Sequence, residues 1–305
     1  MTKLADDLLE SVKTTITIPQ SQVLLTNTRI LSFANDEIES KVVPMVSGLN
    51  QNYFVYQENE TLTANQEFSD IPYRAIGRTL RDLKLTDEGG AVRDLTLIAM
   101  EDSHLYSSTA GIVGFYFIGD RIRLVNPTTS TGLSLNKFYL LKPNKLVESS
   151  SAGKITNVSG TTLTLSSMPS SFAANATADI IQGKQGNRLY NMDVTITNVS
   201  GLQVTLSSVN SSVSAGDYVA LSCESPVIQL PDEIYPYLVF LTSKRCLEAI
   251  GDFEAAGALD KEILIRKKNC EQLLAPRIEG ESIKIFNRNG IIRRHRGRYL
   301  RGTIY

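Results

Sequence analysis

The sequence predicts an α+β protein in which helices at both ends of the chain flank a long β region. Near both ends, apolar residues recur every three or four positions, which is the spacing of one face of an amphipathic helix. From about residue 48 to residue 230, alternating β-branched and aromatic runs such as "FYFIGDRIRLV" are separated by clusters of Gly, Pro, Asn and Ser, as in antiparallel sheets. We therefore expect the terminal helices to pack together and the β region to project from them.

The N-terminal region, residues 1–52, is predicted to contain two helices. A short helix covers about residues 3–13. A longer one covers residues 20–46, where the apolar stripe includes Val23, Ile30 and Val42. Pro44 is expected to bend this helix near its end, because proline cannot donate a backbone hydrogen bond.

The β region divides into a β domain at residues 53–150 and a duplicated hairpin module at residues 151–230. The module contains "ITNVSGTTLTLSS" at 155–167 and "ITNVSGLQVTLSS" at 196–208. In each copy a glycine, Gly160 or Gly201, supplies the positive φ of a tight turn between two alternating runs. Each copy therefore predicts a hairpin, and the pair predicts a small sandwich or barrel, inserted in the chain, with exposed Ser/Thr-rich faces.

Helical periodicity returns in residues 231–277. The first helix is predicted to begin at Asp232 as N-cap, to hold Pro236 in its first turn and to end at Gly251. The second is predicted to run from about Asp252 to Pro276. Its apolar stripe is formed by Phe253, Ala256, Leu259, Ile263, Cys270, Leu273 and Leu274.

Catalytic, cofactor and metal sites are not expected. The only histidines are His104 and His295, which leaves no pair for a metal site or a triad in the body of the chain, and no phosphate-binding or nucleophile motif occurs. The cysteines, Cys223, Cys246 and Cys270, are odd in number without metal-ligand spacing, so they are interpreted as reduced core thiols. The sequence does not predict an enzyme.

Two charge clusters inside the chain are interpreted as solvated or ion-paired faces. The acids are Asp36, Glu37 and Glu39, which fall on the polar side of the long N-terminal helix. The cations of "IPYRAIGRTLRDLKL" are Arg74, Arg78, Arg81 and Lys84, which would share one face if this segment were helical. For the cations, a solvated or intersubunit ion-pair face is favoured over a nucleic-acid contact.

The C-terminal segment, residues 278–305, has a different charge from the rest of the chain. Formal net charge is −1, yet residues 284–305 carry +7 with no acid, so the remainder carries −8. Interleaved apolar residues such as Ile285, Phe286 and Ile292 make it too apolar for a solubilising tail. We predict a docking arm that is ordered only in an assembly and that binds an acidic groove or DNA phosphates. Its predicted partner-binding residues are Lys284, Arg288, Arg293, Arg294, Arg296, Arg298, Tyr299 and Arg301.

Several strings, taken in order, carry a resemblance. They are "IPYRAIGRTLRDL", "GFYFIGDRIRLVNP", "FYLLKPNKLV", the hairpin pair, "GDYVAL", "LPDEIYPYLVFLTSKRCLEAIGD" and "LLAPRIEGESIKIFNRNGIIRR". Over about residues 20–295 the chain resembles the head-to-tail connector proteins of tailed bacteriophages, the adaptor rings that dock beneath the portal. It differs from the smallest members in its length and its duplicated hairpin. A short-tailed, crAss-like phage is compatible with the resemblance.

The resemblance implies a homo-oligomeric neck ring of twelve copies, coaxial with the portal protein and continuing the DNA channel. In it, the terminal helices form the adaptor core and ring wall, and the C-terminus reaches into the portal. The implied partners are portal, further neck or tail proteins and, non-specifically, DNA. The implied location is the virion neck, after synthesis in the bacterial cytoplasm, without a membrane partner.

The sequence is also compatible with two other function classes. A β-rich surface adhesin or head-decoration protein would explain the Ser/Thr-rich hairpins, and a trimer or monomer in place of a closed ring would distinguish it. A nucleic-acid-binding or processing protein would explain the basic C-terminal segment, and metal-dependent cleavage of DNA would distinguish it.

Overall fold

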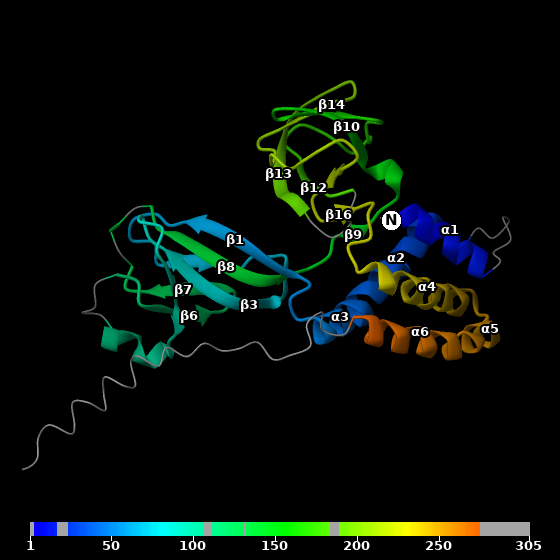
Figure 1. Ribbon diagram of the computed structural model, residues 1–305, viewed down its shortest axis with the longest axis horizontal. Helices are drawn as coiled ribbons and strands as arrows, with labels where there is room; N and C mark the ends of the chain where they lie inside the picture. Colours follow the sequence, from blue (N-terminus) through cyan, green and yellow to red (C-terminus); the bar gives the residue numbers. More distant parts are fainter. Residues whose placement is uncertain are drawn as a thin grey trace, which may run out of the picture. The chain divides into compact units, whose positions relative to one another are not determined.

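A computed structural model describes residues 3–16, 24–106, 111–127, 129–130, 132–183 and 189–274. The chain is a mixed α+β protein with several antiparallel sheets, as predicted (Figure 1). The α-helices are α1 (Ala5–Thr15), α2 (Asn27–Glu37), α3 (Val43–Leu49), α4 (Tyr235–Ile250), α5 (Phe253–Ala258) and α6 (Asp260–Leu273). A π-helix, η1 (Ile38–Val42), joins α2 to α3, and the 3-10 helices are η2 (Met100–Tyr106), η3 (Ser149–Ser151) and η4 (Asp232–Ile234). Across the described residues, no helix has the length and apolar character needed to cross a membrane.

The strands between the helices form two four-stranded sheets, a short parallel pair and a closed barrel. One sheet has the order β1 (Val55–Thr61), β8 (Ser134–Leu141), β3 (Ala75–Thr86), β4 (Val92–Asp94). The other has the order β2 (Phe68–Asp70), β7 (Arg121–Val125), β6 (Gly114–Ile118), β5 (Thr96–Leu97). The parallel pair is β9 (Lys145–Leu146) with β16 (Glu224–Ser225). The barrel contains β10 (Gly153–Ser159), β11 (Thr162–Leu165), β12 (Thr177–Ile181), β13 (Leu189–Ser200), β14 (Gln203–Leu206) and β15 (Tyr218–Leu221).

Buried side chains from α1, α2, α3 and α4 belong to one apolar cluster. Leu8 of α1, Ile30 of α2 and Leu238 of α4 are among its members with no exposed surface. Cys270 of α6 joins the same cluster, and α4 contacts α1, α2 and α6. Burial of this cluster is the main force that holds these short helices, because helices of this length are marginal alone in water.

The long N-terminal helix is interrupted by a π-turn and not by a simple bend. Helix α2 begins after Thr26, whose side chain accepts a hydrogen bond from the Arg29 amide. In η1 the amide of Val43 reaches back five residues to the Ile38 carbonyl. Pro44 follows at once and cannot donate to the preceding turn, so the wider π-turn lies where the regular helical bonding is already lost. The helix therefore starts about seven residues later than predicted, and it is deformed beside Pro44, where a bend was predicted.

The C-terminal helices differ from the prediction at their starts and in their number. Asp232 lies in the 3-10 turn η4, and α4 begins three residues later with Pro236 in its first turn, so Asp232 is not its N-cap. Gly251 ends α4 at φ +86°, as predicted. Asp252 caps the next helix by accepting from the Ala255 amide at 3.0 Å. That helix breaks at Leu259 into α5 and α6.

The β domain encloses its own apolar core between the two four-stranded sheets. Leu85, Ile122 and Leu135, from three different strands, are fully buried in it. The segment of Arg74, Arg78, Arg81 and Lys84, considered above as a helix, is a turn residue, Arg74, followed by strand β3, which pairs with β8. Gly77 and Arg78 both have positive φ there, which interrupts the pairing and excludes a helix.

The duplicated sequence folds as two equivalent hairpins within the closed barrel, as predicted. They are β10–β11 and β13–β14, and their turn glycines, Gly160 and Gly201, have φ values of +60° and +58°. In each hairpin a threonine hydroxyl, of Thr156 or Thr197, donates to the carbonyl oxygen eight residues later at 3.0 Å. The same register irregularity follows Ile155 and Ile196.

The equivalence extends over the whole barrel as a pseudo-two-fold. A shift of 41 residues carries β10–β11–β12 onto β13–β14–β15. The shift relates Leu163 to Val204 and Asp179 to Ala220, and each of these is also a cross-strand pair in the barrel. The pseudo-two-fold axis therefore passes through both pairs. At the second pair the symmetry is broken, because one copy has a buried carboxylate where the other has a methyl group.

Candidate functional site

The predicted docking residues lie outside the described part of the chain. They are Lys284, Arg288, Arg293, Arg294, Arg296, Arg298, Tyr299 and Arg301. The predicted arm at 278–305 and His295 lie outside it as well. The described residues contain three other features that can carry function: a cleft, a buried ion-pair network and two exposed apolar surfaces.

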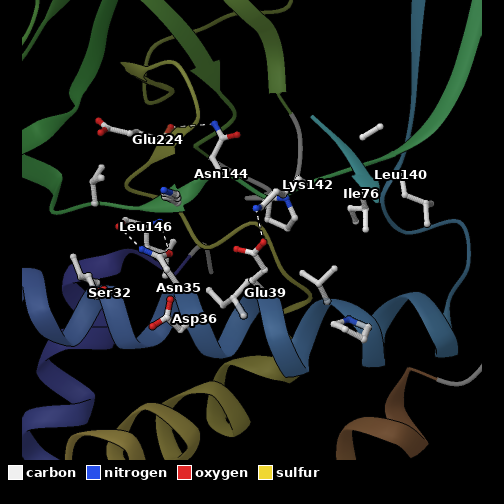
Figure 2. Close-up of a pocket in the computed structure, with 18 of the residues that line it drawn as sticks. Ser32, Asn35, Asp36, Glu39, Ile76, Leu140, Lys142, Asn144, Leu146 and Glu224 are labelled. Carbon is white, nitrogen blue, oxygen red and sulfur yellow. Dashed lines mark hydrogen bonds and ion pairs between the residues drawn. The ribbon is translucent and has the colours of Figure 1, made fainter. Parts of the chain in front are cut away.

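The cleft has a volume of about 790 Å³ and lies between α2–η1–α3 and two β segments. Helix residues such as Ser32, Asn35 and Glu39 line one side (Figure 2). The start of β3 and the chain from Leu140 to Glu148 line the other, together with Glu224. The lining mixes apolar side chains with carboxylates and, among the described residues, includes neither histidine nor cysteine.

Asn35 joins the helix to the cleft's opposite wall. Its side-chain oxygen accepts from the Leu146 amide at 2.8 Å, and its nitrogen donates to the Leu146 carbonyl at 3.1 Å (Figure 2). The Asn35 side-chain amide therefore makes the two backbone hydrogen bonds that a further strand would make to the edge of β9. Nearby, Lys142 Nζ lies 2.6 Å from Glu39 Oε1 across the mouth of the cleft.

The acids of the N-terminal helix do not form one solvated face. Asp36 and Glu39 line the cleft. Glu37 is buried, and its Oε2 lies 2.6 Å from Lys41 Nζ one turn later, so the prediction of a solvated face is wrong for this residue. On the other wall, burial raises the pKa of the Glu224 carboxyl, and the nearby Lys145 opposes this shift in part.

The buried ion pair joins Arg74, the residue before β3, to Asp179, at the two-fold position of the barrel. Arg74 Nη1 lies 2.7 Å from Asp179 Oδ2, and Nη2 lies 2.9 Å from Oδ1, a bidentate geometry. The two side chains are 4% and 0% exposed. Asp179 also accepts from the Asn144 side chain and from the amides of Asp193 and Cys223.

The outer side of Arg74 binds a second carboxylate. Nη2 lies 2.7 Å from Asp193 Oδ1, which also accepts from the hydroxyls of Tyr73 and Ser222. Burial lowers the pKa of Arg74, but the hydrogen bonds and charge of Asp179 outweigh it, so the net pKa lies above the ordinary value. Burial likewise raises the pKa of Asp193, and its hydrogen bonds with Ser222, Tyr73 and Arg74 bring it below the ordinary value.

The other cations of this segment are dispersed, so they do not form the single basic face considered above. Arg78 Nη1 lies 3.7 Å from Asp120, and Arg81 donates to the Gln51 carbonyl at 2.6 Å. Lys84 Nζ lies between Asp82 and Asp94, at 3.3 and 3.0 Å. Arg78 and Lys84 thus have carboxylate partners within the chain, and Arg81 has a backbone carbonyl as its partner.

Exposed large apolar side chains gather on two separate groups of elements. One group follows the chain from β4 to η2 and includes Leu97 and Leu105. The other lies on α5 and α6 and includes Phe253, which is 71% exposed, Leu264 and Ile265. The predicted apolar stripe of the second C-terminal helix is thus only partly core. Its fully buried members are Ala256 and Cys270, while Phe253 and Leu273 face outward.

His104, the histidine in the body of the chain, is not among the residues that line the cleft. His104 is exposed in η2, with its Nδ1 2.7 Å from the Glu101 carbonyl oxygen. Over the same residues, no cluster of three or more His, Cys, Asp or Glu side chains is placed to hold a metal ion. Cys246 and Cys270 are buried thiols as predicted, and burial raises the pKa of Cys246 to about 12. Cys223 is half-buried beside the Arg74 network.

Comparison with known proteins gives no identification: no protein-family model matches this chain, and neither does any curated protein sequence. Among the described features, the buried ion pair can fix the barrel to the segment that leads into β3.

Two of these features are signalled in the sequence. Asp179 interrupts the apolar run "ADII", and its repeat-mate is Ala220, so the broken repeat marks a carboxylate with a special role. The run "ILI" at residues 263–265 spans too much of a helix circumference for one buried stripe. No local pattern indicated Arg74 as the partner of Asp179, because the two residues are 105 positions apart.

Proposed function

We propose that this chain is a structural virion protein of tailed bacteriophages, which forms an oligomeric ring between portal and tail and continues the DNA channel. In this proposal the ring has about twelve copies to match the portal, since closed rings follow from repeated head-to-tail contacts. The protein acts by binding, without catalysis, and is located in the virion neck after synthesis in the host cytoplasm.

The observation that carries the proposal is the shared apolar cluster of the terminal helices. Side chains from α1, α2 and α3 and from α4 and α6, which are separated in sequence by the whole β region, belong to it. This supports an adaptor core of N- and C-terminal helices, with the β domain at 53–150 and the hairpin module at 151–230 as additions. The two groups of exposed apolar side chains support an assembly, because a monomer leaves them in water.

The C-terminal segment at 278–305 is assigned to docking on the portal. Its charge of +7 favours an acidic groove on the partner, and its interleaved apolar residues supply surface to bury. Lys284, Tyr299 and the six arginines named above are the proposed contacts. Non-specific contact with DNA in the channel is the competing use of the same charge.

The ring is tested by measuring the mass of the full chain with and without the portal protein of the same phage. We expect about twelve copies bound per portal. One or two copies per portal would overturn the proposal. A trimer that ignores portal would favour a decoration protein or adhesin, and metal-dependent cleavage of added DNA would favour a nucleic-acid enzyme.

Docking by the C-terminal segment is tested by truncation after Ser282. We expect the truncated chain to lose portal binding and to keep the thermal melt of the body. A matched pair of full-length variants separates the effect of charge on docking from the effect of side-chain size. Replacing the six arginines by Lys keeps the charge and should preserve docking, whereas replacing them by Gln should abolish it. Protection of this segment from trypsin by DNA alone, and not by portal, would reassign it to DNA.

A further inference from the structure

The α6 surface combines exposed apolar side chains with two cations on one helical face. Lys261, Leu264, Ile265 and Lys268 have the spacing i, i+3, i+4, i+7, so they lie together. All four are exposed, and Leu264 is 55% exposed. Neither lysine forms an ion pair within the described part of the chain. The opposite side of α6 packs inward through Cys270 and through Arg266, which stacks on Phe240.

The surface from β4 to η2 combines apolar side chains with the opposite charge. Leu97, Met100 and Leu105 are exposed there, Leu105 at 65%. Residues 92–106 contain three acids and one arginine, a formal charge of −2. Glu101 and Asp102, in the first turn of η2, are exposed and form no ion pair among the described residues.

We propose that these two surfaces bind each other between neighbouring copies, with α6 of one copy against the β4–η2 surface of the next. Each copy carries both surfaces, one apolar and basic and the other apolar and acidic, on elements with different cores. A contact between two different surfaces of one chain is heterologous and repeats head to tail, which generates a ring when the rotation closes. Charge complementarity fixes the orientation, and the apolar side chains supply the buried area. This inference rests on the proposed ring and names its subunit interface.

The test is a charge reversal measured as copies bound per portal, with the full-length chain. Lys261→Glu with Lys268→Glu places acids against acids, and Glu101→Lys with Asp102→Lys places cations against cations. Each pair should reduce a ring of about twelve copies to fewer than about three, and all four changes together should restore the ring. A control is Lys267→Glu, which reverses a single charge on α6 outside this face and should leave the ring intact.

The outcomes separate the interface from the ring. All substitutions are at exposed positions, so unchanged thermal melts should accompany any loss of assembly. A full ring in both reversal variants would overturn the interface and leave the ring standing. If the protein associates in a concentration-dependent manner without forming a closed ring, and the reversals abolish this association, the proposed interface is supported and the proposed ring is contradicted. Absence of self-association, free or with portal, would overturn both.

Discussion

Substitution of Arg74 by Ala should destabilise the protein far more than substitution of Arg78 or Arg81, the arginines of β3. The change leaves Asp179 fully buried with hydrogen bonds from Asn144 and two amides but without its counter-charge. Removing one partner of a buried ion pair costs about 3–5 kcal/mol, because the remaining charge is uncompensated. Arg78→Ala is the matched control. Its exposed pair with Asp120, at 3.7 Å, should be worth less than about 1 kcal/mol.

The reverse change is expected to cost less. In Asp179→Ala, Arg74 keeps the half-exposed carboxylate of Asp193 and the hydroxyl of Ser222, so we expect a loss of about 2–3 kcal/mol. The double variant Arg74→Met, Asp179→Ala makes the site apolar and restores the symmetry with Ala220. It should recover at least about 1.5 kcal/mol relative to Arg74→Ala.

The measurement is urea unfolding followed by circular dichroism and tyrosine fluorescence, with each variant compared with the wild type. An Arg74→Ala variant that loses less than about 1 kcal/mol, or no more than Arg78→Ala, would refute the reasoning. So would a double variant that is less stable than both single variants, since the pair would then not be coupled.

Three further predictions concern the fold and its pH dependence. The raised pKa of Glu224 means that the folded state holds a proton more tightly than the unfolded state, so stability falls as pH rises from 4.5. Glu224→Gln should remove this pH dependence. In urea titrations at neutral pH it should raise the free energy of unfolding by up to about 0.5 kcal/mol. The pKa values of Glu60 and Asp193 are lowered in the fold, so their contribution is present above their ordinary values of 4.5 and 3.8 and is lost as pH falls below them. Thermal melts between pH 7 and pH 3 should show this loss, and a flat profile would contradict it. Gly183→Ala should cost about 1–3 kcal/mol in the same assay, because its new methyl would lie 2.0 Å from the Gly216 carbonyl oxygen, whereas Gly48→Ala, with open space around it, should not destabilise.

The sequence predicted best those features that are determined by residues close together in the chain. The duplicated stretch predicted its own hairpins, because the alternating residues and the turn glycines Gly160 and Gly201 determine strand, turn and register together. Helix ends with a dedicated residue, such as Asp252 and Gly251, were also predicted correctly. The start of α4 was missed by three residues, because a 3-10 turn intervenes after Asp232.

Features that depend on distant residues could not be predicted. Arg74 has the spacing of a helical basic face, yet tertiary pairing with β8 makes the segment a strand, and the barrel supplies its buried partner. Likewise, the run "ILI" indicates that one stripe cannot bury all three residues, but only the packing of α6 on α4 determines that Leu264 and Ile265 face outward. For the predicted C-terminal contacts, including Arg288 and Arg293, the sequence is the sole basis.

The most direct test of the ring is negative-stain imaging of the full-length protein with and without portal, followed by rotational averaging. The account predicts a closed ring on the portal axis, with about twelve-fold symmetry, that appears at least when portal is present. Portal particles without added axial density, or with density that lacks rotational symmetry, would contradict it.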